Sequence, residues 1–306
     1  MKLLKKLCEL HGPSGEEYRI RDFIIEYVQT NSKKWKKSPD IITDNLQGNI
    51  ILVFGKPKLA VFAHMDSVGF TARYNNQLVR IGSPVITQGT KLRGFCGNDL
   101  VVGELLVNEE DDSISIKSEK TIDPGTALAF CPNFQEDEEY VVSPFLDNRL
   151  GVYTCLKIAK DLENGILVFT SLEEHGGGSV EIIARILYEK YKITKALIAD
   201  ITWVTDGVFH GQGAVVSLRD KYIPRKDFVD LIRNILKTND LKHQIEVEES
   251  GSSDGGYLQK TPYPIDWCFI GAPEANAHSA EERVHKNDIE SMMKIYKILV
   301  KKLQDY

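Results

Sequence analysis

Two uninterrupted apolar runs lie near the start of the chain. Residues 49–54 and 59–63 are almost entirely apolar, and a Gly-Lys-Pro-Lys turn separates them. Short apolar runs bounded by turn residues are typical of buried strands. Upstream, between Leu3 and Val28, apolar residues recur at helical spacing in two stretches. The pattern therefore predicts helices followed by two buried strands.

The turn between the two helical stretches carries a capping signal. Ser14 is followed three residues later by Glu17, which is the spacing of a capping box. We therefore expect Ser14 to open the second helix, which runs through Ile20 to Val28.

Helical and extended patterns alternate in the second half of the chain. Helical spacing over 150–162 precedes the apolar run 166–171, and helical spacing over 180–187 precedes the run 196–199. Strands that alternate with helices are joined by crossover connections, which produce parallel neighbours. We predict an α/β protein with a mixed, largely parallel sheet flanked by helices, ending in a helix over 289–303.

The intervening segment, residues 71–142, has a different pattern. Short extended runs alternate with Asn-Asn, Gly and Pro-Gly turns, and no helical stretch occurs. This pattern is typical of a small β-barrel. We therefore expect two domains. Residues 1–70 and 143–306 would form the α/β domain, and residues 71–142 would form an inserted β-rich domain.

Composition narrows the class of protein. Hydrophobic residues account for 42% and charged residues for 27%, and no apolar run approaches the roughly 20 residues that cross a bilayer. The net charge of −6 argues against a nucleic-acid partner, because phosphate binding needs a basic face. The N-terminus lacks the apolar core of a secretory signal, and the five cysteines form no C-x-x-C pair. We expect a cytoplasmic protein with reduced thiols and no membrane partner.

Residue types that bind metals follow three of the predicted strands. In chain order they are His64, Asp66, Glu173, Glu174 and Asp200. Ligands of open α/β sheets bind beyond the carboxyl ends of the strands, so these side chains are expected to converge in one crevice. His64 and Asp66 lie on the same side of an extended chain, which allows Asp66 to accept the proton of the second ring nitrogen and orient the ring.

Each of these signals also has a plain structural explanation. A strand-end histidine is often held by hydrogen bonds alone, and adjacent glutamates often form a solvated turn. Burying several acids together without a cation is costly, however. The combination favours a metal site.

Several motifs spread over nearly the whole chain carry a family resemblance. They are His64-Met65-Asp66, Leu146-Asp147-Asn148-Arg149-Leu150-Gly151, Glu173-Glu174, Asp200 and His278-Ser279, with His11-Gly12-Pro13-Ser14-Gly15 near the start. This set resembles the tetrahedral or glutamyl aminopeptidases, which are binuclear metallo-exopeptidases. The long separation between His64 and Asp147 leaves room for the insertion and selects this family among relatives that share the ligand set.

The resemblance implies a ligand set for two divalent metal ions, Zn²⁺ or Co²⁺ in the first place and Mn²⁺ as a further candidate. His64 would bind one ion and His278 the other, and Asp147 would bridge both. Glu174 and Asp200 would complete one site each.

The resemblance also implies the catalytic roles, the substrate and the assembly. Glu173 would act as general base, and Asp66 would orient His64. The substrates would be short peptides with a free N-terminus, and the chain would form a homo-oligomer, a dodecamer in the family.

The chain departs from the family at Asn148, where a second acid is usual, and after Glu174, where three glycines follow His175.

Two alternatives stay open at this stage. Ser253 lies in a G-x-S-x-G segment, and Asp266 and His278 follow it in the order of an α/β-hydrolase triad. Their close spacing leaves no room for the usual intervening elements, and the strand-end acids would have no role. The other alternative is a catalytically inactive peptide-binding homologue, although every candidate residue is present. The favoured hypothesis is a metal-dependent aminopeptidase that uses a two-metal-activated water.

Overall fold

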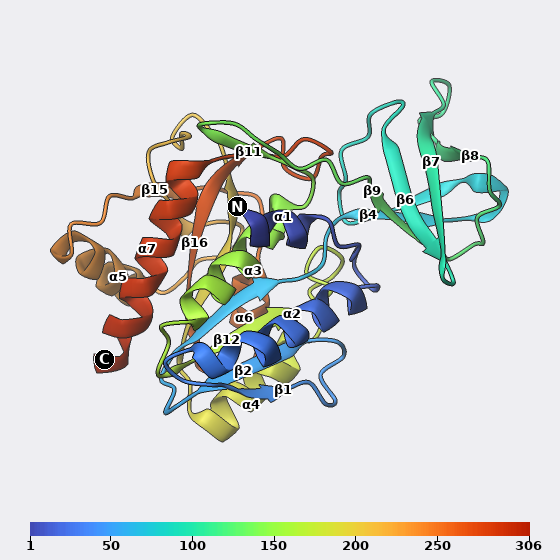
Figure 1. Cartoon of the computed structure of the whole chain (residues 1–306). Helices are drawn as coiled ribbons and strands as arrows, with labels where there is room; N and C mark the ends of the chain where they lie inside the picture. The colour runs from blue at the N-terminus through green and yellow to red at the C-terminus, as the bar shows by residue number, and fades with distance from the viewer.

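The computed structural model describes residues 1–306 as two β-sheets, with helices covering the larger sheet (Figure 1). The α-helices are α1 (Lys2–Cys8), α2 (Tyr18–Asn31), α3 (Leu146–Ala159), α4 (Val180–Tyr191), α5 (Lys226–Thr238), α6 (Asp254–Gln259) and α7 (Lys286–Lys302). Short 3₁₀ turns are η1 (Ser32–Lys34), η2 (Tyr74–Asn76) and η3 (Leu303–Asp305).

The larger sheet has eleven strands. Its main path in space is β1 (Asp40–Ile42), β2 (Ile50–Phe54), β12 (Gly165–Thr170), β3 (Ala60–His64), β13 (Lys195–Trp203), β16 (Asp266–Ala275), β17 (Arg283–His285), β11 (Tyr140–Val142) and β10 (Gln135–Glu136). β14 (Val215–Arg219) pairs with β16, and β15 (Gln244–Val247) pairs with β14. The central strands β12, β3, β13 and β16 are parallel neighbours. This confirms the predicted mixed sheet with parallel strands at its centre, whereas β1, β2, β17, β11 and β10 pair with their neighbours in antiparallel fashion.

Alternating side chains of the central strands divide between two hydrophobic layers. In β2, Ile50, Leu52 and Phe54 join the layer that includes α1, α2, α3, α5 and α7, whereas Ile51 and Val53 join the layer that includes α4 and α6. Helices therefore cover both faces of the sheet. Because both faces are buried, the strands are continuous apolar runs in the sequence.

The second sheet has six strands and stands beside the helical body (Figure 1). In spatial order they are β5 (Leu78–Ile81), β4 (Gly69–Ala72), β9 (Ala127–Phe130), β6 (Lys91–Cys96), β7 (Asp99–Val107) and β8 (Ile114–Ser118). Neighbouring strands are antiparallel, and the sheet has its own buried cluster of 14 residues. The structure thus contains the small β-rich unit that the turn-punctuated pattern predicts.

The last part of the expected insertion joins the larger sheet. The sequence analysis places residues through 142 in the inserted domain, but β11 pairs with β17 and β10 pairs with β11. The physical reason is that Val141 of β11 is fully buried in the core of the larger sheet. We propose that the inserted unit comprises the small sheet alone, from Gly69 to Phe130.

The predicted capping box at Ser14 is wrong. α2 begins at Tyr18, and the Ser14 hydroxyl donates instead to Oδ2 of Asp66 at 2.6 Å. Oε1 of Glu17 accepts from the backbone N–H groups of Gly15 and Leu172. Both side chains therefore tie the N-terminal turn to the ends of the central strands.

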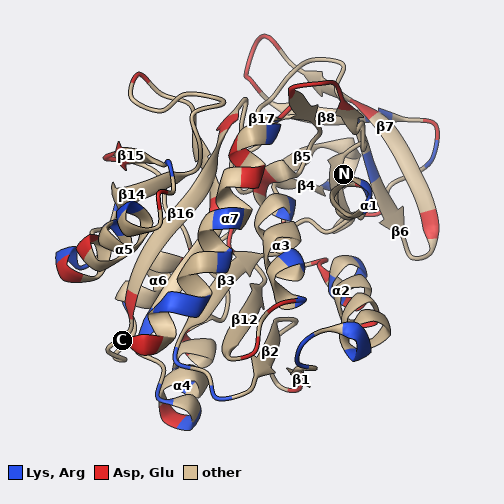
Figure 2. Ribbon diagram, turned by 60° about the vertical axis from the view of Figure 1, so that its left-hand side comes forward, with Lys and Arg blue, Asp and Glu red and all other residues tan.

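The charged side chains form no single basic face along the helices. Figure 2 shows Lys and Arg distributed over α2, α3, α5 and α7, and acids lie among the basic residues of α5 and α7. None of the helices has the length and apolar character needed to cross a membrane.

Candidate functional site

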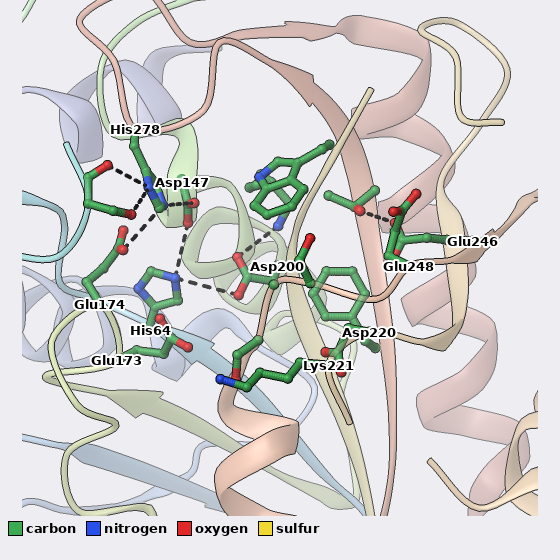
Figure 3. Close-up of a pocket in the computed structure, with 18 residues that line it drawn as sticks. His64, Asp147, Glu173, Glu174, Asp200, Asp220, Lys221, Glu246, Glu248 and His278 are labelled. Atoms are coloured by element: carbon green, nitrogen blue, oxygen red, sulfur yellow. Dashed lines mark hydrogen bonds and ion pairs between the residues drawn. The ribbon is translucent and has the colours of Figure 1, made fainter. Parts of the chain in front are cut away.

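The parallel central strands bring the predicted side chains to one cavity at their carboxyl ends. The cavity has a volume of about 350 Å³ (Figure 3). It is lined by six of the predicted residues, namely His64, Asp147, Glu173, Glu174, Asp200 and His278. His64 ends β3, Asp200 lies in the neighbouring β13, and the glutamates follow β12. The convergence is the one expected for strands that end at a common edge.

Asp147 lies between two groups of donor atoms. Its Oδ1 is 3.1 Å from Nε2 of His64, which is 3.6 Å from Oδ2 of Asp200. Its Oδ2 is 3.3 Å from Nε2 of His278, which is 3.3 Å from Oε2 of Glu174. Within each group the donor atoms lie within 4.8 Å of one another. The structure thus assigns Asp200 to the His64 group and Glu174 to the His278 group, a pairing that the sequence analysis left open.

Asp66 lies behind His64 and is completely buried. Its Oδ1 is 3.5 Å from Nδ1 of His64 and accepts the backbone N–H of Glu173 at 3.1 Å. Its Oδ2 accepts the hydroxyl of Ser14 and the backbone N–H of Glu174. Burial opposes ionisation of Asp66, but the hydrogen bonds and the charge of His64 hold its pKa below the usual value. Asp66 is therefore fixed where it can orient the His64 ring.

Burial makes several acids of the cavity hard to ionise. It raises the pKa of Glu174 well above its usual value, and the charge of Asp147 raises it further. Burial and the charge of Asp147 also raise the pKa of Asp200 to about 6. For Asp147 itself burial acts in the same direction, but hydrogen bonds from His278 and His64 hold its pKa well below the usual range. A cation bound here would favour the ionised form of each acid.

Asn148, where the chain departs from the family pattern, has a structural role. Its side-chain N–H donates to the backbone oxygen of Ala199 in β13 at 2.9 Å. Its Oδ1 accepts the backbone N–H of Gly151 at 2.8 Å. Asn148 therefore ties the first turn of α3 to the strand that carries Asp200, next to Asp147.

The structure excludes the alternative serine triad. Ser253 is buried and accepts the N–H of Gly255 as the N-cap of α6. Asp266 begins β16 and pairs with Arg225, whereas His278 lies beyond the other end of that strand. A ten-residue strand is about 30 Å long, so Asp266 cannot reach the His278 ring.

The wall of the cavity away from the histidines contains residues that sequence reasoning missed. They are Ile201, Thr202, Trp203, Asp220, Lys221, Glu246, Glu248, Ser250 and Phe269. Gly251 and Ser252 of the G-x-S-x-G segment also line this wall. Figure 3 shows Glu246 and Glu248 on the side opposite His278 and Glu174. Glu246 and Glu248 lie in and just after β15, a strand without any motif, so no sequence signal pointed to them.

Comparison with known proteins agrees with this fold and site. The model of the M42 glutamyl aminopeptidase family matches residues 102–295. A candidate aminopeptidase of Acetivibrio thermocellus is 27% identical over 327 residues, which cover 96% of this chain and 96% of that protein.

Two solved structures show the same fold over nearly the whole chain. A TET aminopeptidase from a marine sediment archaeon (Thaumarchaeota) superposes with a TM-score of 0.86 at 18% identity, covering 99% of this chain and 96% of that one. The TET1 peptidase of Pyrococcus horikoshii superposes with a TM-score of 0.83 at 24% identity, covering 98% of both chains. The family model spans more than half of the sequence. The chain therefore belongs to the M42 glutamyl aminopeptidase family and is a metal-dependent aminopeptidase.

Proposed function

We propose that the chain removes N-terminal residues from short peptides with a water molecule activated by two divalent metal ions. The observation that carries this proposal is the position of Asp147, whose two carboxylate oxygens face His64 on one side and His278 on the other. Two ions roughly 3.5–4 Å apart require an anionic group between them. A carboxylate shared by two donor groups meets that requirement.

The donor atoms fit divalent ions by their chemistry. His64, Asp147 and Asp200 would hold one ion, and Asp147, Glu174 and His278 the other. Imidazole nitrogen and carboxylate oxygen suit Zn²⁺, Co²⁺ and Mn²⁺. The buried Oε1 of Glu174 has no hydrogen-bond partner in the protein, which supports a ligand there. When bound, the ions would polarise the scissile carbonyl and lower the pKa of a water molecule.

Glu173 is the proposed general base. It lines the cavity but belongs to neither donor group. Burial raises its pKa well above the usual value, and the charge of Glu174 adds to this effect while His64 opposes it. A carboxyl group with a raised pKa is a stronger base, which can accept a proton from water and deliver it to the leaving amine. Asp66 would act through His64 by keeping its ring in the ligating orientation.

The proposal extends to the substrate and the assembly. The solved TET1 peptidase of Pyrococcus horikoshii assembles into a tetrahedron or a large octahedral shell, and a related structure is a dodecamer. By analogy, this chain would form a homo-oligomer in the cytoplasm. An enclosed assembly would admit short or unfolded peptides and exclude folded proteins.

Metal removal tests the proposal. A chelator should abolish the hydrolysis of aminoacyl anilides, and Zn²⁺, Co²⁺ or Mn²⁺ should restore it. Elemental analysis of the same sample should find two ions per chain in the active protein. Activity that survives the chelator and is lost to a serine-directed phosphonate would contradict the metal mechanism.

A further inference from the structure

We infer that Ser83, which belongs to the inserted unit, positions His278 as a metal ligand; this inference rests on the two-metal site proposed above. Ser83 lies between β5 and β6 of the small sheet, whereas His278 follows β16 of the larger one. Oγ of Ser83 is 2.9 Å from Nδ1 of His278, and the backbone oxygen of Ser83 is 3.3 Å from the same nitrogen. One residue of the insertion therefore faces the ring nitrogen of His278 that does not contact Asp147 or Glu174.

The hydroxyl and the backbone oxygen of Ser83 together determine which ring nitrogen carries the hydrogen, and the hydroxyl makes the shorter contact. A carbonyl oxygen can only accept a hydrogen bond, so its contact favours a hydrogen on Nδ1 of His278. The Ser83 hydroxyl can accept from the same N–H. Nε2, which faces Asp147 and Glu174, is then the nitrogen left with a lone pair in the neutral ring. This is the tautomer that a metal ion on the Asp147 side requires.

The segment around Ser83 is anchored to the same region by its backbone. The N–H of Val85 donates to the backbone oxygen of His278 at 2.8 Å. The N–H of Gly82 donates to Nδ1 of His175, next to Glu174, at 3.1 Å. His278 has a φ of 61°, a left-handed conformation that is unfavourable for a residue with a side chain. The bond from Val85 helps to hold this conformation.

The two histidines of the site are oriented by different means. Nδ1 of His64 lies 3.5 Å from the buried carboxylate of Asp66, and the His64 side chain is 2% exposed. His278 is held by a hydroxyl and a carbonyl, and its side chain is 21% exposed. The ion on the His278 side should therefore depend on the inserted unit, whereas the ion on the His64 side should not.

Metal titration of the Ser83→Ala protein tests the inference. The metal-free wild type, titrated with Co²⁺ and followed by calorimetry and visible absorption, should bind two ions. Ser83→Ala removes the hydroxyl, which makes the shorter contact, and keeps the backbone oxygen. It should weaken one binding step by about tenfold, the lower end of the usual effect of removing a group that orients a ligand, and leave the other step unchanged. Ser83→Thr, which keeps a hydroxyl, should restore the weakened step. His278→Ala should lose that same step.

A matched control is Ser118→Ala, because Ser118 is another hydrogen-bonded serine of the small sheet that does not line the cavity. Its hydroxyl, on β8, donates to the backbone oxygen of Val102. It should bind both ions as the wild type does. The inference is wrong if Ser83→Ala binds both ions with wild-type affinity, or if Ser118→Ala weakens binding equally. A wild type that binds only one ion would instead overturn the two-metal function, and the inference with it.

Discussion

Glu173 and Glu174 are neighbours in the chain, yet only Glu174 lies in a donor group. We predict that Glu173→Gln keeps both metal ions but lowers kcat by about 10²–10⁴, the usual contribution of a general base. Glu174→Gln should also lose the ion on the His278 side. Elemental analysis and steady-state kinetics on the same samples distinguish the two cases. If Glu173→Gln lost an ion and Glu174→Gln kept both, Glu174 would be the general base and Glu173 the metal ligand.

The charge of the cavity wall predicts a preference for basic N-terminal residues. Asp220, Glu246 and Glu248 line the wall together with a single cation, Lys221. Glu246 is buried and accepts the hydroxyl of Thr202, and burial raises its pKa. A lysine or arginine side chain of a substrate would favour the ionised carboxylates. We therefore expect Lys- and Arg-anilides to be cleaved with higher kcat/KM than the Glu-anilide.

The variant Glu246→Gln tests this preference. It should lower kcat/KM for the Lys-anilide by about 10- to 100-fold, because a hydrogen bond to a charged group contributes about 1.5–3 kcal/mol. The Leu-anilide serves as the control and should be affected little. A wild type that cleaves the Glu-anilide best would show that Lys221, rather than the acids, sets the specificity.

For individual residues, the sequence predicted which side chains lie together in the cavity but not which hydrogen-bond partners orient them. The placement of His64 and Asp200 followed from apolar runs that end in polar residues. The role of Ser83 could not be predicted, because a serine in a surface loop carries no pattern and its partner lies 195 positions away. The partner of Ser14 was missed for a similar reason, since a long-range bond to Asp66 replaced the local cap.

Among the elements, α7 is joined to two central strands through one hydroxyl. Tyr296 is fully buried, and its hydroxyl oxygen is 2.7 Å from the backbone oxygen of Ile198 in β13 and 2.9 Å from that of Ile270 in β16. Tyr296→Phe should reduce the free energy of unfolding by about 1–3 kcal/mol, the usual cost of leaving a buried polar group unpaired. Urea denaturation measures this change.

The exposed Tyr74 provides the control for this prediction. Tyr74→Phe should leave the free energy of unfolding nearly unchanged, because this side chain is 58% exposed. If Tyr296→Phe and the wild type have equal free energies of unfolding, the Tyr296 hydroxyl makes no net contribution to stability.

Element types were more predictable than element partners. The continuous apolar runs of β2, β3 and β12 identify them as strands buried on both faces. The pairing of β11 with β17 was not predictable, because strands this short carry too few residues to reveal which sheet they join. The long-range packing of Val141, rather than the local sequence pattern, determines that β11 joins the larger sheet.

For the whole molecule, we predict self-association. Light scattering on the intact chain at micromolar concentration should give a mass that is a multiple of 34.5 kDa. The small sheet presents exposed apolar side chains, among them Leu100 and Val102 of β7, which suit contact with another copy. A protein that runs as a monomer and still cleaves short peptides would contradict the assembly and leave the metal mechanism intact.

The donors of the site come from widely separated parts of the chain, and this has a consequence for the newly made protein. Asp147 serves both donor groups, but it follows the whole inserted unit, and His278 follows every other donor. Chains emerge from the ribosome from the N-terminus at about 5–20 residues per second. A nascent chain therefore carries His64 and Asp66 for many seconds without a complete metal site. On the proposed mechanism, peptidase activity can begin only after His278 has been made, so the growing polypeptide up to that point would be protected from its own chemistry.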